Sequence, residues 1–315
     1  MATKNSLGLI SLLLGVVLVT AASGCIGPDG GKTTSGTGVV INTFEPRLAN
    51  VESGESTSLH LEVQNTGDFN NAPTVAELTG INLQEWSVSD QYKDLGQLLA
   101  PDPDSETEGG MAAADWEMTA PQLFERQSQT YEPITRVYYY YETRAIKPVL
   151  FVTAEELRRI VDSGEAFQTE ATTMTSGPIT ADITAGKFVK SRDWQSSKFT
   201  LQVHLGNAGG GFIFGKDYPV YVEIEWPDGI TPVGDCPREI GYGFSWYENL
   251  PPGLRQPSFG RVVRLWKNEE TDVFCEFQVS QPPTNRVTKN FEVKLGYIYY
   301  TDKHTTLTVK GTEQF

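Results

Sequence analysis

Two stretches, SLHLEVQNTGD at residues 58–68 and FTLQVHLGNAGGG at residues 199–211, decide the fold that the sequence predicts. Apolar residues alternate with polar ones in both, at Leu59, Leu61 and Val63 in the first. Such alternation is typical of a strand with one buried face. Each stretch ends in an Asn followed two residues later by a Gly, a composition that favours a tight turn. The sequence therefore predicts the same strand and turn twice, 142 positions apart.

The segments around these stretches follow the same order twice, which indicates a duplicated unit. Residues 39–44 correspond to 178–183, and Tyr140 corresponds to Tyr299, 159 positions later. The second copy therefore carries about 17 extra residues, which we place in a loop insertion around 227–260, rich in Pro, Gly and aromatic residues. Each copy contains about seven short strands separated by turn signals, the pattern of an immunoglobulin-like sandwich.

One segment between the copies departs from the strand pattern. Thr153 and Glu156 have the spacing of a helix capping box, and apolar residues follow at helical intervals. Gly164 stands where a helix C-cap is expected. The sequence predicts one short helix over residues 154–163.

The stretches 58–68 and 199–211 also resemble the strand and turn of CARDB-type and related immunoglobulin-like modules on prokaryotic, especially archaeal, cell surfaces. This resemblance implies a fold and a surface setting, and it implies no activity. We expect an all-β chain of two tandem immunoglobulin-like β-sandwiches with one short helix between them. The expected domains are residues 39–153 and 177–315, joined by a helix and connector at 154–176.

The N-terminal residues predict export. Lys4 precedes the apolar run Leu7–Ala22, and small residues then lead to Cys25. This order is typical of a secretory signal, and the run is short for a membrane span. The small residues ending in Cys resemble the lipobox of prokaryotic lipoproteins, although Ala22 stands where that family usually has Leu. The resemblance implies that residues 1–24 are a signal peptide and that Cys25 is lipidated; plain cleavage nearby and an uncleaved anchor are the alternatives.

Composition and charge set the expected location. Residues 25–38 are rich in Gly, Ser and Thr, which predicts a flexible, lipid-attached tether. Without residues 1–24 the chain has 24 basic and 40 acidic residues, a net charge of about −16. This charge argues against a nucleic-acid partner, because phosphate binding needs clustered Lys and Arg. We expect a protein held by lipid at the outer face of the cell membrane, with a protein or glycan partner at the cell surface.

Two cysteines, Cys236 and Cys275, are left once Cys25 carries a lipid. An exported chain meets an oxidising compartment, so we predict a disulfide between them; two free thiols are the alternative. Two thiolates without a nearby His make a poor metal site.

An aromatic segment in the insertion is the candidate binding face. Tyr242, Phe244 and Trp246 alternate with small residues, and Tyr247 follows. Alternation would place the first three rings on one side of a strand. Exposed rings would form a platform for a sugar or a protein. Buried rings would belong to the core of the second copy, and the sequence leaves both interpretations open.

An acidic run in the first copy could hold calcium, because carboxylate oxygens are the ligands that this ion prefers. However, Thr107 stands where an EF-hand loop needs Gly, so a solvated loop is the favoured interpretation. The candidate ligands are Asp102, Asp104, Glu106 and Glu108.

The sequence predicts no catalytic site and no cofactor. The three histidines, His60, His204 and His304, are expected at exposed strand positions or beside a turn, and no pattern brings them together. We therefore expect a non-enzymatic, membrane-anchored surface lipoprotein that acts as an adhesion, binding or envelope-scaffold module. The alternative is a solute- or glycan-recognising accessory subunit of a transport or carbohydrate-processing system. An enzyme assembled from distant loops is the third hypothesis.

Overall fold

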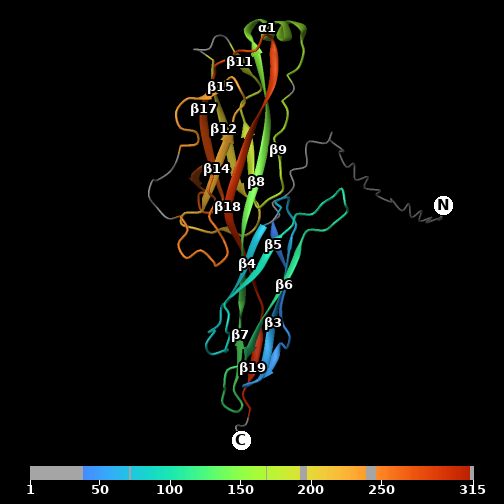
Figure 1. Cartoon of the computed structure of the whole chain (residues 1–315), viewed down its shortest axis with the longest axis vertical. Coiled ribbons are helices and arrows are strands. Elements are labelled where there is room, and N and C mark those ends of the chain that lie inside the picture. Colours follow the sequence, from blue (N-terminus) through green and yellow to red (C-terminus); the bar gives the residue numbers. More distant parts are fainter. Residues whose placement is uncertain (1–37, 71, 168, 192–196, 239–245, 313–315) are drawn as a thin grey trace, which may run out of the picture. The chain divides into compact units, whose positions relative to one another are not determined.

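The regular structure of the described residues is mostly β-strand, as the alternating residues predict (Figure 1). The structure is a computed structural model, and it describes residues 38–70, 72–167, 169–191, 197–238 and 246–312. Within these residues the prediction of an all-β fold with one short helix is confirmed. The predicted signal peptide, Cys25 and nearly all of the tether lie outside them. In the described part no helix is long and apolar enough to cross a membrane.

The first copy of the repeat contributes eight strands and the helix within the described residues. They are β1 (Val39–Pro46), β2 (Asn50–Glu52), β3 (Ser56–Asn65), β4 (Ala72–Thr79), β5 (Tyr92–Leu98), β6 (Met111–Thr119), β7 (Ser128–Tyr131), β8 (Ile134–Thr153) and α1 (Ala154–Ser163).

The connector and the second copy contribute the remaining described strands. They are β9 (Thr173–Met174), β10 (Ile179–Thr184), β11 (Val189–Ser191), β12 (Lys198–Asn207), β13 (Phe212–Ile213), β14 (Pro219–Glu225), β15 (Ile230–Pro232), β16 (Arg261–Arg264), β17 (Glu270–Val279), β18 (Arg286–His304) and β19 (Leu307–Lys310).

These strands form two lobes that share one sheet. In the first lobe the sheet β1-β3-β6 packs against the shared sheet, and in the second lobe β10-β12-β17-β15 does so. The shared sheet has nine strands, with the main order β16-β14-β18-β8-β4-β5. One continuous cluster of buried side chains runs through both lobes, from Val39 to Val309. A small sheet of order β2-β19-β7 completes the first lobe.

The helix α1 has the predicted limits. The side chain of Thr153 accepts a hydrogen bond from the backbone N–H of Glu156 at 3.2 Å. Gly164 adopts the left-handed conformation, with φ of 71°, and its N–H bonds to the last turn. The Glu156 carboxylate pairs with Arg159 at 2.8 Å, so the helix start rests on the Thr cap and this ion pair.

The duplication is visible in the hydrogen bonds of the two Asn-x-Gly turns. Asn65 donates to the carbonyl of Phe69 at 2.9 Å and accepts from the N–H of Gly67 at 3.1 Å. Asn207 makes the same two bonds, to Gly211 at 3.0 Å and from Gly209 at 3.2 Å. Each Asn therefore closes its own turn at the end of an equivalent strand.

The tyrosine correspondence predicted from the sequence is wrong by one residue. The N–H of Phe69 donates to the hydroxyl of Tyr141 at 3.1 Å, and the N–H of Gly211 donates to Tyr299 at 2.8 Å. Tyr299 thus corresponds to Tyr141, whose ring is buried, and not to Tyr140 on the opposite face of β8. A shift of one residue reverses the face of a strand, so sequence letters alone could not settle the match.

The two copies are joined by one long antiparallel ladder. β8 pairs with β18 over its length, from Ile134 opposite His304 to Val152 opposite Arg286 (Figure 1). β7 pairs with β19 in the same register, with Tyr131 opposite Leu307. The ladder therefore extends through both lobes without a shift, interrupted only by the short breaks between β7 and β8 and between β18 and β19.

Because of this ladder, the last strand of each copy pairs with strands of the other lobe. The end of β8 pairs with β11 of the second copy, and β19 pairs with β2 and β7 of the first. The described residues all belong to one compact unit, Thr33–Phe315. The strands β8 and β18 continue through both lobes. The division into separate domains at 39–153 and 177–315 therefore stays a prediction.

The last strand should stabilise the first lobe. Leu307 is fully buried, so Leu307→Ala should lower the free energy of unfolding by about 2–5 kcal/mol in chemical denaturation. Hydrogen exchange should become faster in β2 and β7, the strands that β19 pairs with. Thr308→Ala, on the half-buried side of the same strand, is the control and should cost less. Faster exchange confined to β12 and β17 would contradict this assignment.

Candidate binding site

The predicted aromatic face is buried where the structure describes it. Trp246 is 9% exposed and Tyr247 is 7% exposed, so neither presents an open ring face. Tyr242 and Phe244 lie outside the described residues. The interpretation of Trp246 and Tyr247 as a binding platform is therefore corrected, and they form part of a second core.

This second core covers the outer face of the nine-stranded sheet. Tyr138 on β8 and Ile298 on β18 point away from the main core and would be exposed without a cover. The insertion supplies Trp246, Tyr247 and Leu254 against them. Burying this apolar surface stabilises the fold, which is the physical reason that Trp246 and Tyr247 do not face solvent.

Ring stacking fixes Tyr247 within this core. Its ring lies 6.3 Å from Tyr221 and 6.2 Å from Phe214, with interplanar angles of 9° and 13°. Burial raises the pKa of the Tyr247 hydroxyl far above its ordinary value. The residue therefore acts as a neutral packing ring.

A buried carboxylate lies at the margin of the second core. Glu77 accepts hydrogen bonds from the hydroxyls of Tyr138 at 2.7 Å and Tyr92 at 3.0 Å, and from the Gln91 amide at 2.8 Å. These donors compensate the loss of water around the carboxylate. The arrangement ties β4, β5 and β8 together and leaves Glu77 fully engaged.

The end of the insertion packs onto a glycine in β18. A Cβ placed on Gly296 would lie 2.5 Å from the ring of Phe259, so only glycine allows this close approach. The ammonium of Lys294 lies 3.8 Å from the centre of the same ring and 3.3 Å from Glu142. The insertion is thus clamped on the shared sheet at its C-terminal end.

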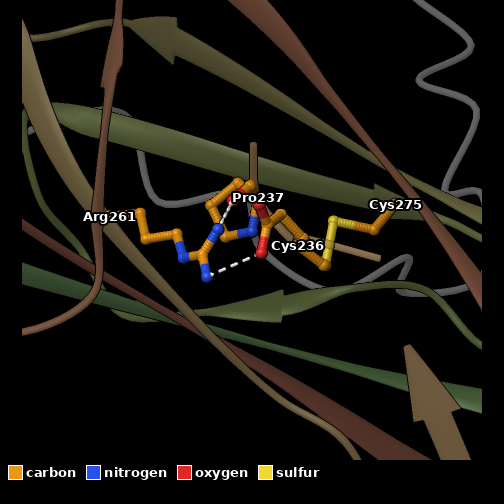
Figure 2. The surroundings of a disulfide bond; sticks show 5 residues. Cys236, Pro237, Arg261 and Cys275 are labelled. Carbon is orange, nitrogen blue, oxygen red and sulfur yellow. Dashed lines mark hydrogen bonds and ion pairs between the residues drawn. A yellow bond between two sulfur atoms is a disulfide. The ribbon is translucent and has the colours of Figure 1, made fainter. Parts of the chain in front are cut away.

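The predicted disulfide fixes the insertion at its other end (Figure 2). Cys236 is bonded to Cys275 of β17, with the two Cα atoms 5.3 Å apart. Arg261 of β16 donates to Asp235 at 3.0 Å and to the carbonyl of Pro237 at 3.3 Å. The residues around Cys236 are therefore tied to both sheets of the second lobe.

The candidate calcium ligands of the acidic run are not gathered into one group in the structure. Asp102 accepts from the hydroxyl of Ser105 at 2.7 Å and from the N–H of Asp104 at 3.0 Å. These bonds, the first above all, lower the pKa of Asp102. In the part of the chain that the structure describes, no group of three or more His, Cys, Asp or Glu residues is placed to hold a metal. Asp104, Glu106 and Glu108 are thus not gathered with Asp102 as ligands.

The three histidines lie on three different sheets, as expected for separate strand positions. His60 is on β3, His204 on β12 and His304 on β18. His60 contacts Asp115 at 2.9 Å and Glu62 at 3.4 Å. His204 contacts Asp272 at 3.0 Å in the same manner.

An open hollow lies at a position for which the sequence predicts no site. It lies between the turn before β14 and the tight turn in the connection from β16 to β17, and its volume is about 450 Å³. Trp266 is 69% exposed beside it. A Trp within the polar hairpin sequence WKNEE was the signal that could have identified this position. The lining residues are Asp217, Tyr218, Arg264, Leu265, Trp266, Lys267 and Thr271.

The hairpin that carries Trp266 is fixed by Asn268. Lys267 and Asn268 both have positive φ, 51° and 65°, as a two-residue hairpin turn requires. The Asn268 side chain donates to the carbonyl of Gly211 at 2.9 Å and accepts from the N–H of Ile213 at 2.9 Å. The backbone beside Trp266 is therefore held against β13 by bonds that leave the indole outside.

Comparison with known proteins gives no family. No family model and no curated protein matches the chain. A mutant of Salmonella alpha-2-macroglobulin aligns at 8% identity and a TM-score of 0.22, over 89% of this chain and 17% of that one. The Enterococcus faecalis MSCRAMM ACE aligns at 9% identity and a TM-score of 0.15, over 87% and 95% of the two chains. This chain spans about a sixth of the length of the macroglobulin, and similarity at these scores defines neither family nor function.

Removing the disulfide should destabilise the protein. The bond closes a loop with a sequence separation of 39, and its loss in Cys236→Ser/Cys275→Ala should cost about 2–5 kcal/mol. The measurement is the denaturant midpoint of the oxidised protein and the variant. Parent protein treated with reductant is the matched control and should behave like the variant. An unchanged midpoint on reduction would rule out a stabilising role.

His60 should titrate above the ordinary histidine range. The hydrogen bond to Asp115, followed by that to Glu62, raises the pKa of His60 above 6.5. The stabilising contribution of the charged imidazole is therefore complete below about pH 6.5 and lost as pH rises through the raised pKa. NMR titration should show that Asp115→Asn lowers this pKa more than Glu62→Gln. The reverse order would contradict the geometry.

Proposed function

We propose that this chain is a membrane-anchored, non-enzymatic surface lipoprotein that works as a binding module. The observation that carries the proposal is the use of the three cysteines. Cys236 and Cys275 are bonded to each other, which leaves Cys25 as the remaining thiol. It follows the apolar run Leu7–Ala22 and small residues, the context of a lipidated cysteine.

The disulfide also supports an exported protein. Disulfides persist in oxidising compartments and are rare where thiols are kept reduced. Cys275 is buried within the second lobe, and its bond ties β17 to the insertion that covers the shared sheet. A chain built around such a bond fits the environment to which an N-terminal signal would deliver it.

The arrangement of polar groups supports binding rather than chemistry as the role. Glu77 is engaged by three donors, and Asp102 closes its own loop. His60 and His204 contact carboxylates on separate sheets. The hollow beside Trp266 has an exposed indole and an ion pair between Asp217 and Arg264. Aromatic and charged side chains of this kind are common at ligand-binding and protein-binding sites.

Metabolic labelling tests the anchor. Cells that express the parent chain and are fed radioactive fatty acid should yield labelled protein in the membrane fraction, because a thioether-linked diacylglycerol on Cys25 carries the label. Cys25→Ser should remove the label and release the protein from membranes. Cys236→Ser, which keeps Cys25, is the matched control and should stay labelled. Equal labelling of the parent and Cys25→Ser would refute the lipid anchor.

A further inference from the structure

We propose that the hollow beside Trp266 binds a neutral sugar ring of a surface glycan. The inference rests on the proposed function, since it names the ligand of a surface binding module. Trp266 is 69% exposed, more than any other tryptophan in the described residues. Single exposed apolar residues are common on proteins, but this one borders a hollow of about 450 Å³ with polar groups beside it.

The lining has the two kinds of contact that a pyranose needs. One face of a sugar ring presents C–H groups, which pack on an indole, and its edge presents hydroxyls. Leu265 is buried and forms an apolar part of the lining beside Trp266. An aromatic surface with polar groups at its margin is the usual composition of a small-molecule site.

An ion pair at the hollow matches neighbouring sugar hydroxyls. The Arg264 guanidinium lies 3.0 Å from the Asp217 carboxylate, and both side chains remain partly exposed. A hydroxyl both donates and accepts hydrogen bonds. A carboxylate acceptor next to guanidinium donors can therefore bind two adjacent hydroxyls, with Asp217 accepting from one and Arg264 donating to the other.

The backbone around the hollow is arranged before any ligand arrives. Asp217 and Tyr218 both have positive φ, 60° and 57°, and for a tyrosine this conformation is uncommon. On the opposite side the Lys267–Asn268 turn is held by the Asn268 hydrogen bonds. Residues held in such conformations cluster at binding sites, where a fixed geometry lowers the entropy lost on binding.

The charged groups of the hollow give an acidic ring little advantage. The Asp217 carboxylate lies at the hollow and would repel a uronate or a sulfate. Of the two lining cations, Arg264 is already paired with Asp217, and the Lys267 ammonium lies over the Trp266 ring, 5.7 Å from its centre, so each already has an interaction within the protein. The whole chain carries a net charge of −15, which disfavours anionic partners further.

Glycan binding by the full-length protein in detergent tests the inference. The probes are neutral hexose, deoxyhexose and N-acetylhexosamine oligosaccharides, acidic and sulfated oligosaccharides, and proline-rich peptides, on one array. We expect binding to neutral oligosaccharides, and binding about tenfold weaker or worse in Trp266→Ala, because a central aromatic residue carries much of such an interface. Trp266→Tyr should retain part of the affinity, and Asp217→Asn should weaken it.

Phe274→Ala is the matched control. Phe274 is 61% exposed on β17 and does not line the hollow, so its removal should leave binding unchanged. Circular dichroism of each variant reports folding. The proposal is overturned if no neutral oligosaccharide binds, if Trp266→Ala binds like the parent, or if only acidic sugars or peptides bind. The fatty-acid labelling is independent, so failure here would leave the anchor standing, and failure of the anchor would not affect binding in detergent.

Discussion

The antiparallel pairing of β8 with β18 is the constraint on which the rest of the structure depends. Its register extends unchanged to β7 and β19, so one ladder runs through both lobes. Because each side chain alternates between faces, this register fixes which residues enter the core of each lobe. Tyr139 and Tyr141 on one strand and Tyr297 and Tyr299 on the other lie on its buried face as a result.

The same ladder creates the need for a cover. Its outer face presents Tyr138 and Ile298, which are buried only because the insertion packs over them. The disulfide at Cys236 and the close contact of Phe259 with Gly296 hold that insertion at its two ends. The extra residues of the second copy thus serve packing over the shared sheet, where they also cover Val75 of β4 in the first copy.

Trp266 is exposed because the segment that carries it does not pack on the outer face of the sheet. The rings of the insertion cover the sheet, whereas the turn between β16 and β17 is fixed by Asn268 and leaves the indole in solvent. A rigid exposed ring beside the Asp217–Arg264 pair is suited to a ligand with one apolar face and a polar edge. Placed on a lipid-anchored chain, such a site would face the surroundings of the cell.

The sequence alone predicts the all-β class, the alternating strands β3 and β12, the helix limits and the Cys236–Cys275 disulfide. The strands and the helix follow from local signals, such as the alternation at Leu59, Leu61 and Val63 or the cap at Thr153, and the disulfide follows from the number of cysteines in an exported chain. Only the tertiary structure decided that Trp246 is buried and Trp266 exposed, and that Tyr299 corresponds to Tyr141. The reason is physical. Periodicity specifies that a strand has two faces, but which face is covered depends on segments far along the chain that pack on it, and no local pattern records that choice.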